Sequence, residues 1–475
     1  MAEQDNAAGP AGAAPVACDT LIANGYVLTL DGQRRVFPSG AVAVDGVRIV
    51  GVGPEAELRQ RFRPLRVIDA GGGVVHPGMI DPHLHTSIQL SRTAFSDDPK
   101  VNSFEKFAAW YNNLTDEDEF ANALAACAEM VRNGFTCAME PGTVFEPDML
   151  AAAAEAIGVR MSLSDPYVWD TIDGGNTMAE RLPRAPATPK RAAEQLGRQL
   201  YRNKAKDSLV HAHVCIYGSG STSEALELAA KRCADANGTI LNQHQNFMPN
   251  QVAIDDRRFG GKPVLVRFAE LGLLAPNVSF THMNVIRDEE IEPIVASGMS
   301  IVWQPGNYQY YAIAKTEPQR MPELMARGVN VTLCVDAAKI WTFGEMARIA
   351  YLCARQAGHY ISSETLMEMQ TIGAARAVGL AHEIGSLEVG KRADIVVRDP
   401  DLVEGLPAFN PVMQLIMLSQ SRSVATVLCN GRVILKDRRL ALCSESWVNQ
   451  VARTSIARLA ERLDLRPDTR WTARA

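Results

Sequence analysis

Short apolar runs separated by turn residues dominate the first part of the chain. These runs lie at residues 20–22, 26–30, 41–44 and 48–53. The dipeptides Asn24-Gly25, Asp31-Gly32 and Asp45-Gly46 stand between them. Asn-Gly and Asp-Gly favour tight turns between antiparallel strands. Residues 390–397 and 424–434 repeat the pattern near the far end. The pattern therefore predicts a piece of a β-sandwich at the start of the chain and similar strands near its far end.

The middle of the chain, from residue 76 to about residue 379, alternates short apolar runs with helical patterns. Apolar side chains recur at helical spacing over residues 117–132 and 223–237, which predicts two helices. Later apolar runs at residues 240–241, 278–280, 300–303 and 329–333 predict strands, each followed by polar residues. This rhythm is typical of βαβ units and predicts an α/β fold. Residues 447–463 predict a further, amphipathic helix.

Composition excludes several classes of protein. The chain has 475 residues, of which 47% are hydrophobic, so a large core is expected. A net charge of −6 without long charged runs argues against a nucleic-acid or anionic-membrane partner. Nine cysteines without a Cys-x-x-Cys pair suggest reduced thiols in a cytoplasmic protein. Residues 1–17 lack the basic start and apolar centre of a signal peptide, and we expect a flexible tail there.

Two histidines one residue apart follow the first apolar run of the middle region. His83 and His85 come directly after Pro77-Gly78-Met79-Ile80-Asp81-Pro82. In an extended chain residues i and i+2 point to the same side, so both imidazoles can meet one metal ion. A lone histidine is more often an ordinary core or surface residue. A His-x-His pair at the end of a buried strand favours a metal site.

This stretch resembles the first-strand motif of the amidohydrolase superfamily, and the resemblance extends from about Asp19 to about Arg439. It implies a metal-dependent (β/α)8 TIM-like barrel inserted in a small composite β-sandwich. We expect a tail at residues 1–17, sandwich strands at 18–75 and 382–440, the barrel at 76–381 and a helical segment at 441–475. Superfamily relatives are often homo-oligomers, so we expect one here.

The resemblance also implies a ligand set. His244, His282 and Asp336 follow later apolar runs and match the fifth-strand histidine, the sixth-strand histidine and the eighth-strand aspartate. Barrel enzymes place their chemistry at these strand ends. We expect His83, His85, His244 and Asp336 to bind the metal, and Asp336 and His282 to act in catalysis. His282 could also be a ligand. Imidazoles and one carboxylate suit Zn²⁺ first, and also Fe²⁺, Co²⁺ or Mn²⁺.

A single ion is expected rather than two. Two-metal members of the superfamily carry a bridging lysine or a glutamate on the fourth strand, and residues 208–216 contain neither. His211 and His213 form a second His-x-His pair within this run, and we expect structural or supporting roles for them. The chain is thus similar to the single-metal branch that contains triazine and cytosine hydrolases.

One departure from that branch bears on the reaction. Many members carry a glutamate three residues after the fifth-strand histidine, where this chain has Phe247. Protonation of a heterocycle nitrogen would lose its usual acid. A metal-activated water and Asp336 suffice for hydrolysis of an amide, urea or (thio)carbamate. This is the leading hypothesis, with a neutral, apolar or aromatic xenobiotic as substrate. In this respect the chain is similar to phenylurea and molinate hydrolases.

Two other hypotheses remain open. The first is an aminohydrolase, or a hydrolytic dechlorinase, of an N-heterocycle such as a triazine. The second is a non-catalytic member that keeps the fold, although the complete ligand set argues against it. For either enzyme the partner is a small molecule. Several aromatic and amide side chains just past strand ends are expected to contact it: Phe247, Trp303, Asn307, Tyr308 and Trp341.

Overall fold

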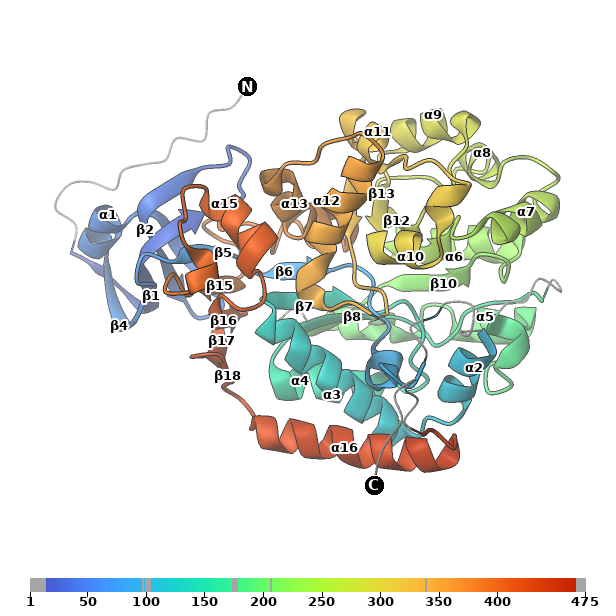
Figure 1. The fold of residues 1–475 in the computed structure, drawn as a ribbon, viewed down its shortest axis with the longest axis horizontal. Coiled ribbons are helices and arrows are strands. Elements are labelled where there is room, and N and C mark those ends of the chain that lie inside the picture. The colour runs from blue at the N-terminus through green and yellow to red at the C-terminus, as the bar shows by residue number, and fades with distance from the viewer. Residues whose placement is uncertain are drawn as a thin grey trace, which may run out of the picture.

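The computed structural model describes residues 14–95, 98, 104–172, 178–205, 207–337 and 340–466. Figure 1 shows a smaller β-rich unit beside a larger unit in which helices surround strands. The expected tail lies outside the described residues up to residue 13, and Val16 and Ala17 already belong to the first strand. None of the helices in the described ranges combines the length and the apolar composition needed to cross a lipid bilayer.

The smaller unit joins strands from both ends of the chain. Its strands are β1 (Val16–Leu28), β2 (Val36–Asp45), β3 (Arg48–Pro54), β4 (Phe62–Asp69), β5 (Val74–Pro77), β15 (Ile395–Arg398), β16 (Val424–Cys429), β17 (Arg432–Lys436) and β18 (Arg439–Leu440). They run in the order β18-β17-β16-β15-β5-β1-β2-β3, with β4 on β1. The antiparallel pairing of β5 with β15 joins the two ends, which confirms the composite β-sandwich.

One expected turn is wrong. Asn24-Gly25 does not reverse the chain but lies inside the long strand β1. Asn24 has a left-handed φ of 55°, and the pairing of β1 with β2 shifts register between Ile22 and Gly25. The dipeptide therefore forms a bulge, because the same left-handed backbone that closes a hairpin can also kink a continuous strand.

The larger unit is the expected (β/α)8 barrel. Its strands are β6 (Met79–Asp81), β7 (Phe135–Met139), β8 (Arg160–Leu163), β9 (Val210–Ala212), β10 (Val214–Gly218), β11 (Leu241–Gln245), β12 (Val278–His282), β13 (Ser300–Trp303) and β14 (Asn330–Leu333). The pairings from β6 to β9 and from β10 to β14 are parallel. His213 separates β9 from β10, which together occupy the fourth barrel position.

The barrel closes through backbone beyond the first and last strands. The amide of His85 donates to the carbonyl of Asp336 at 2.9 Å, and the amide of Asp336 donates to the carbonyl of His83 at 3.0 Å. The Asp81 carboxylate accepts from the amides of His83 and Val335 at 3.1 and 3.0 Å. The two expected metal-binding segments therefore lie side by side at the seam.

Helices cover the outside of the barrel (Figure 1). The α-helices are α1 (Glu55–Arg61), α2 (Phe104–Asn112), α3 (Asp116–Arg132), α4 (Pro147–Ile157), α5 (Pro189–Gln195), α6 (Glu224–Ala236), α7 (Pro249–Arg258), α8 (Val264–Glu270), α9 (Asp288–Ser297), α10 (Pro305–Tyr310), α11 (Met321–Ala326), α12 (Met346–Gln356), α13 (Ser363–Met369), α14 (Ile372–Ala377), α15 (Pro411–Gln414) and α16 (Glu445–Arg462). Short 3₁₀ helices span Thr86–Ser91, Met178–Arg181, Arg198–Lys204, Ile313–Lys315, Phe343–Glu345 and Val403–Gly405, and a π-helix spans Leu415–Ser419.

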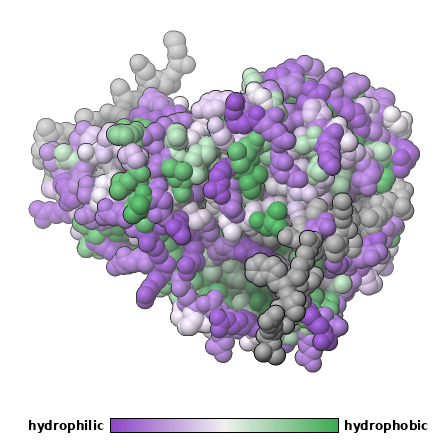
Figure 2. Space-filling model, in the orientation of Figure 1, coloured by the Kyte–Doolittle hydropathy of each residue, from purple (hydrophilic) through white to green (hydrophobic). Residues whose placement is uncertain are grey.

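The helix starts follow the side-chain chemistry of the sequence. Thr115 caps α3, and its hydroxyl and the Asp118 carboxylate satisfy each other's backbone amides. Ser223 caps α6 through the amide of Leu226. The C-terminal helix α16 lies against α3, where Ser455 and Arg458 donate to the buried Asp118 at 2.8 and 3.0 Å. Figure 2 shows a face covered mainly by polar side chains, with apolar ones in small patches.

Candidate metal centre

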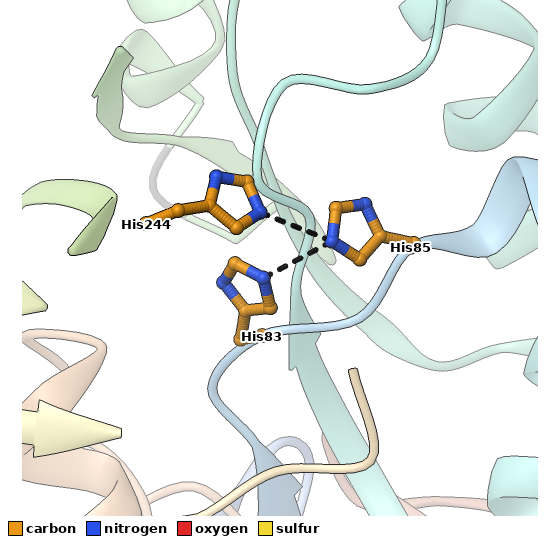
Figure 3. A group of neighbouring side chains, drawn as sticks. All are labelled: His83, His85 and His244. Atoms are coloured by element: carbon orange, nitrogen blue, oxygen red, sulfur yellow. Dashed lines mark hydrogen bonds between the residues drawn. The ribbon is translucent and has the colours of Figure 1, made fainter. Parts of the chain in front are cut away.

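Three histidines meet at the C-terminal ends of the barrel strands. His83 and His85 follow β6, and His244 lies on β11. The Nε2 atom of His85 is 3.2 Å from that of His83 and 3.1 Å from that of His244, as the dashed lines in Figure 3 show. All three side chains are buried. Their ring nitrogens therefore face one point in the barrel mouth.

Each ring is held from behind by its other nitrogen. Nδ1 of His85 lies 2.8 Å from the hydroxyl of Thr143, and Nδ1 of His83 lies 2.9 Å from the hydroxyl of Thr281. Nδ1 of His244 lies 2.9 Å from the backbone carbonyl of Tyr217. A carbonyl only accepts hydrogen bonds, so Nδ1 of His244 carries the proton and Nε2 presents its lone pair.

Asp336 adds a carboxylate to the cluster. Its Oδ1 atom is 3.1 Å from Nε2 of His85 and 3.5 Å from Nε2 of His83. Its Oδ2 atom accepts from the side-chain amide of Asn307 at 2.6 Å. Asp336 has a φ of 61°, which a non-glycine residue rarely adopts. Backbone strain of this kind is common where side chains are aimed for function.

His282 lies at the end of β12, and its φ is 76°. Ligand atoms of His282, His83 and Asp336 lie within 4.8 Å of one another, as do those of His83, His85 and His244. The ring of Phe247 stacks on His282 with centroids 4.2 Å apart. The structure thus brings together all five residues of the expected metal and catalytic set.

The charge states fit a divalent cation. Burial lowers the pKa of His83 to about 4, and burial followed by the neighbouring histidines lowers the pKa of His244 well below its usual value. These imidazoles are therefore neutral near pH 7. Zn–N bonds of about 2.0–2.1 Å in a tetrahedron place ligand atoms roughly 3.3 Å apart, close to the spacing seen. Converging lone pairs at this distance repel each other unless a cation lies between them.

Four residues of the cluster, His85, His244, His282 and Asp336, line a cavity that is open to solvent. The described side chains that line it are mostly aromatic or apolar: His85, Ile88, Phe107, Tyr111, Thr143, Tyr167, Met178, Tyr217, Ser219, His244, Phe247, Gln251, His282, Asn307, Tyr311, Asp336 and Ala337. Asp336 is the sole carboxylate among them. Such a cavity suits an uncharged, flat substrate.

Two of the expected substrate-binding residues line this cavity, namely Phe247 and Asn307. The other three lie elsewhere, which corrects the expectation. Trp303 is fully buried in the core, and the Tyr308 hydroxyl donates to the carbonyl of Glu317 at 2.7 Å. The Trp341 indole donates to the carbonyl of Val335 at 3.0 Å. A position at or just past the end of a strand does not decide whether the side chain points toward the barrel axis or toward the surrounding helices.

His211 and His213 lie outside the metal cluster. His213 is buried, and its Nδ1 atom lies 2.9 Å from the Ser162 hydroxyl of the neighbouring strand. His211 is partly buried. Neither belongs to the groups of described residues whose ligand atoms are close enough to share an ion.

Two residues at the site, Glu140 and Thr143, were not predicted from the sequence. Both follow β7, and Thr143 connects His85 to the buried Glu140 carboxylate, 2.6 Å from the threonine hydroxyl. A polar cluster directly after an apolar run was the available signal, but the later ligands were identified by the resemblance to a known family.

Comparisons with known proteins agree with this geometry. The model of the amidohydrolase family matches residues 74–434. The chain is 31% identical over 442 residues to a 5-methylthioadenosine/S-adenosylhomocysteine deaminase of Syntrophobacter fumaroxidans, covering 89% of this chain and 94% of that relative. It is 26% identical over 464 residues to a 5'-deoxyadenosine deaminase of Methanosarcina mazei, covering 94% and 99% respectively.

Solved structures show the same fold. An adenosine deaminase from Xanthomonas campestris with bound zinc superposes with a TM-score of 0.84 at 24% identity, covering 94% of this chain and all of that one. The atrazine chlorohydrolase TrzN from Arthrobacter aurescens, complexed with zinc, gives 0.79 at 21% identity, covering 93% and 100%. The chain therefore belongs to the amidohydrolase family, and it is a metal-dependent hydrolase of carbon–nitrogen bonds other than peptide bonds.

Proposed function

We propose that the chain is a zinc-dependent aminohydrolase that replaces the exocyclic amine of an uncharged, purine-type N-heterocycle with a hydroxyl group. The chain aligns with the two curated relatives named above along nearly their whole length. Both relatives are named as deaminases of adenosine derivatives. These relatives favour the heterocycle hypothesis over the leading sequence-based hypothesis of amide, urea or carbamate hydrolysis. The observation that carries the proposal is that residues of the histidine–aspartate cluster line an aromatic cavity.

The residues present supply the transfer of a proton from the attacking water to the departing amine. When bound, a divalent metal supplies Lewis acidity that makes water a nucleophile near neutral pH. Asp336 accepts the proton that the attacking water loses and delivers it to the departing nitrogen. The balance is one water consumed and one ammonia released for each amine replaced. His282 lies beside Asp336, where it donates a hydrogen bond to developing negative charge.

The aromatic walls hold the substrate. Phe247 stacks on His282 and reaches Tyr311, whose ring centroid is 5.5 Å away. Stacked rings favour a flat heterocycle and displace water from the reacting atoms. The scarcity of carboxylates among the described lining residues favours a substrate without cationic groups.

One observation favours a second candidate, the hydrolysis of a linear amide, urea or (thio)carbamate. Phe247 occupies the position at which many single-metal relatives carry an acid for the ring nitrogen, and its ring packs on His282 rather than leaving space for another group. A linear C–N bond needs no ring protonation, so Asp336 alone suffices as the proton carrier.

Product analysis separates the two candidates. Zinc-loaded protein should be incubated with 5-methylthioadenosine, 5'-deoxyadenosine and adenosine, with atrazine-type triazines, and with phenylureas, thiocarbamates and anilides. Ammonia together with a ring-hydroxylated product supports the aminohydrolase. Turnover restricted to the linear substrates, with release of an aniline or secondary amine, would replace it with the second candidate. Asp336→Asn should abolish either activity.

We further propose a cytoplasmic homo-oligomer. All nine cysteines are free thiols, which suits a reducing compartment. The test for assembly is light scattering of the purified protein, which should give a mass above that of the 51.7 kDa chain.

A further inference from the structure

We propose that Thr143 and Glu140 are positioning residues that fix the proton of His85 on Nδ1 and thereby present its Nε2 lone pair to the metal. The inference rests on the proposed metal site, in which His85 is a ligand. It adds a second buried carboxylate to the centre, connected to the cation through one hydroxyl group and one imidazole.

The geometry around Glu140 is closed and specific. Its Oε1 atom accepts from the backbone amide of Thr143 at 2.7 Å and lies 2.6 Å from the Thr143 hydroxyl. Its Oε2 atom accepts from the amide of Gly142 at 2.8 Å. The Tyr167 hydroxyl donates to the carbonyl of Thr143 at 2.8 Å. Glu140 and Thr143 are each 2% exposed, so this turn is held in one conformation away from water.

The proton positions follow from the valence of each group. Both oxygens of Glu140 accept from backbone amides, so this carboxyl group is an acceptor toward the turn, and a threonine hydroxyl has a single proton to donate. That proton goes to Glu140, because the two oxygen atoms are 2.6 Å apart. The hydroxyl oxygen can then only accept at the 2.8 Å contact with His85, so Nδ1 of His85 carries the proton. Nε2 is left with its lone pair directed at the cluster.

His85 differs in this respect from the other two histidines. His244 is held by the Tyr217 carbonyl, and His83 by the Thr281 hydroxyl, which also lies 3.5 Å from the side-chain amide of Asn242. Among the hydrogen bonds of the described residues, the Thr143 hydroxyl behind His85 contacts a carboxylate, whereas the Thr281 hydroxyl behind His83 contacts none. A carboxylate behind a ligating histidine raises the basicity of the ring and orients it.

The ion pairs of the described residues include none to Glu140. Burial raises the pKa of its carboxyl group, and the hydrogen bonds from Thr143 and Gly142 oppose this shift. Glu140 therefore acts on the metal centre through its hydrogen bond with Thr143 rather than through an ion pair.

Zinc affinity tests the inference without any substrate. Thr143→Val keeps the shape of the side chain but removes the hydroxyl, and it should weaken zinc binding about 10–100-fold, the usual effect of removing such a partner. Thr143→Ser keeps the hydroxyl and should stay close to wild type. Thr136→Val on β7 is the matched control, because Thr136 is equally buried but lies outside the chain of hydrogen bonds. Competition with a chelator gives the dissociation constants.

A double-mutant cycle separates positioning from general damage. The single variant Glu140→Gln should bind zinc more weakly than wild type. The Thr143→Val/Glu140→Gln double variant should bind zinc no more weakly than Thr143→Val, because the carboxylate acts through the hydroxyl. Strict additivity, unaltered zinc affinity of Thr143→Val, or an equal loss in Thr136→Val would each overturn the inference. A protein that shows the expected zinc affinities but deaminates nothing would refute only the proposed function.

Discussion

The side-chain amide of Asn307 donates a hydrogen bond to Oδ2 of Asp336 at 2.6 Å. The other carboxylate oxygen, Oδ1, faces His85 and His83. Asp336 therefore has one oxygen directed at the metal cluster and one held by the protein. Asn307 is itself held in position, because its backbone amide donates a hydrogen bond to the Gln304 side chain at 2.5 Å.

Replacing Asn307 by leucine should reduce turnover more than substrate affinity. The lost hydrogen bond is to a charged group and is worth about 1.5–3 kcal/mol, which corresponds to roughly a 10–150-fold lower kcat if it acts in the transition state. Steady-state kinetics on the best substrate of the panel gives kcat and KM separately. Gln309→Leu, on the exposed side of α10, is the control. Unchanged kcat in Asn307→Leu would show that the clamp on Asp336 has no catalytic role.

Replacing Phe247 by alanine should raise KM for flat or apolar substrates. An aromatic side chain that covers a bound ligand contributes about 1.5–3 kcal/mol through the area it buries, so kcat/KM should fall about 10–150-fold. Phe409→Ala removes an aromatic ring that is 94% exposed and far from the cavity, and it should leave the kinetics unchanged. An equal fall in both variants would contradict the placement of Phe247 in the substrate site.

Removing the metal should abolish activity and lower thermal stability. A cation that binds only the folded protein stabilises it by about 2.7 kcal/mol at a free concentration one hundred times its dissociation constant. Dialysis against a chelator followed by thermal unfolding should therefore show a lower Tm, and added zinc should restore both Tm and activity. Full activity after rigorous chelation would refute the metal-dependent mechanism for this chain.

Glu227 should make the protein less stable as pH rises. Burial raises the pKa of this carboxyl to about 8 from its usual value of 4.5. Between these values the folded chain holds a proton that the unfolded chain has lost, so the free energy of unfolding falls with rising pH and levels off above about 8. The slope from this single group is at most about 1.4 kcal/mol per pH unit.

Glu227→Gln should remove this pH dependence and stabilise the protein at pH 8. Oε1 of Glu227 accepts from Thr222 and Gln243 at 2.6 and 3.3 Å, and a glutamine oxygen can accept both bonds. Urea unfolding at pH 5 and pH 8 gives the measurement, with the exposed Glu155→Gln on α4 as control. A variant that is less stable than wild type at pH 8 would mean that Glu227 is ionised and compensated in the folded protein.

The individual strands and helices could be predicted because their signals are local, whereas the barrel and the composite β-sandwich were expected from the resemblance to a known family. The strand-and-turn pattern at each end, the Thr115 and Ser223 caps and the alternation between strands and helices all act over a few residues. The converging ligands could be placed because parallel barrel strands bring their C-terminal ends to one mouth. His83, His244 and Asp336 lie far apart in the sequence, and only the resemblance to a known family linked them in advance.

Other features depend on directions that a sequence pattern does not encode. Trp303 and Phe247 both come at or just after the end of a strand, yet Trp303 enters the core and Phe247 enters the cavity. Asn24-Gly25 has the composition of a hairpin turn but forms a bulge. Asn307 was expected to face the substrate, and although it lines the cavity its amide also holds Asp336. In each case a tertiary contact decides the outcome.

The seam of the barrel gives the metal a second consequence. The backbone of Asp336 donates to the carbonyl of His83 and accepts from the amide of His85, where the earliest and the latest barrel segments meet. A cation held by both side chains would act as a reversible cross-link between segments that the chain synthesises far apart. Binding of the ion would thus complete the folding of the barrel as well as activate the site. A molecule without the ion would unfold first at this seam.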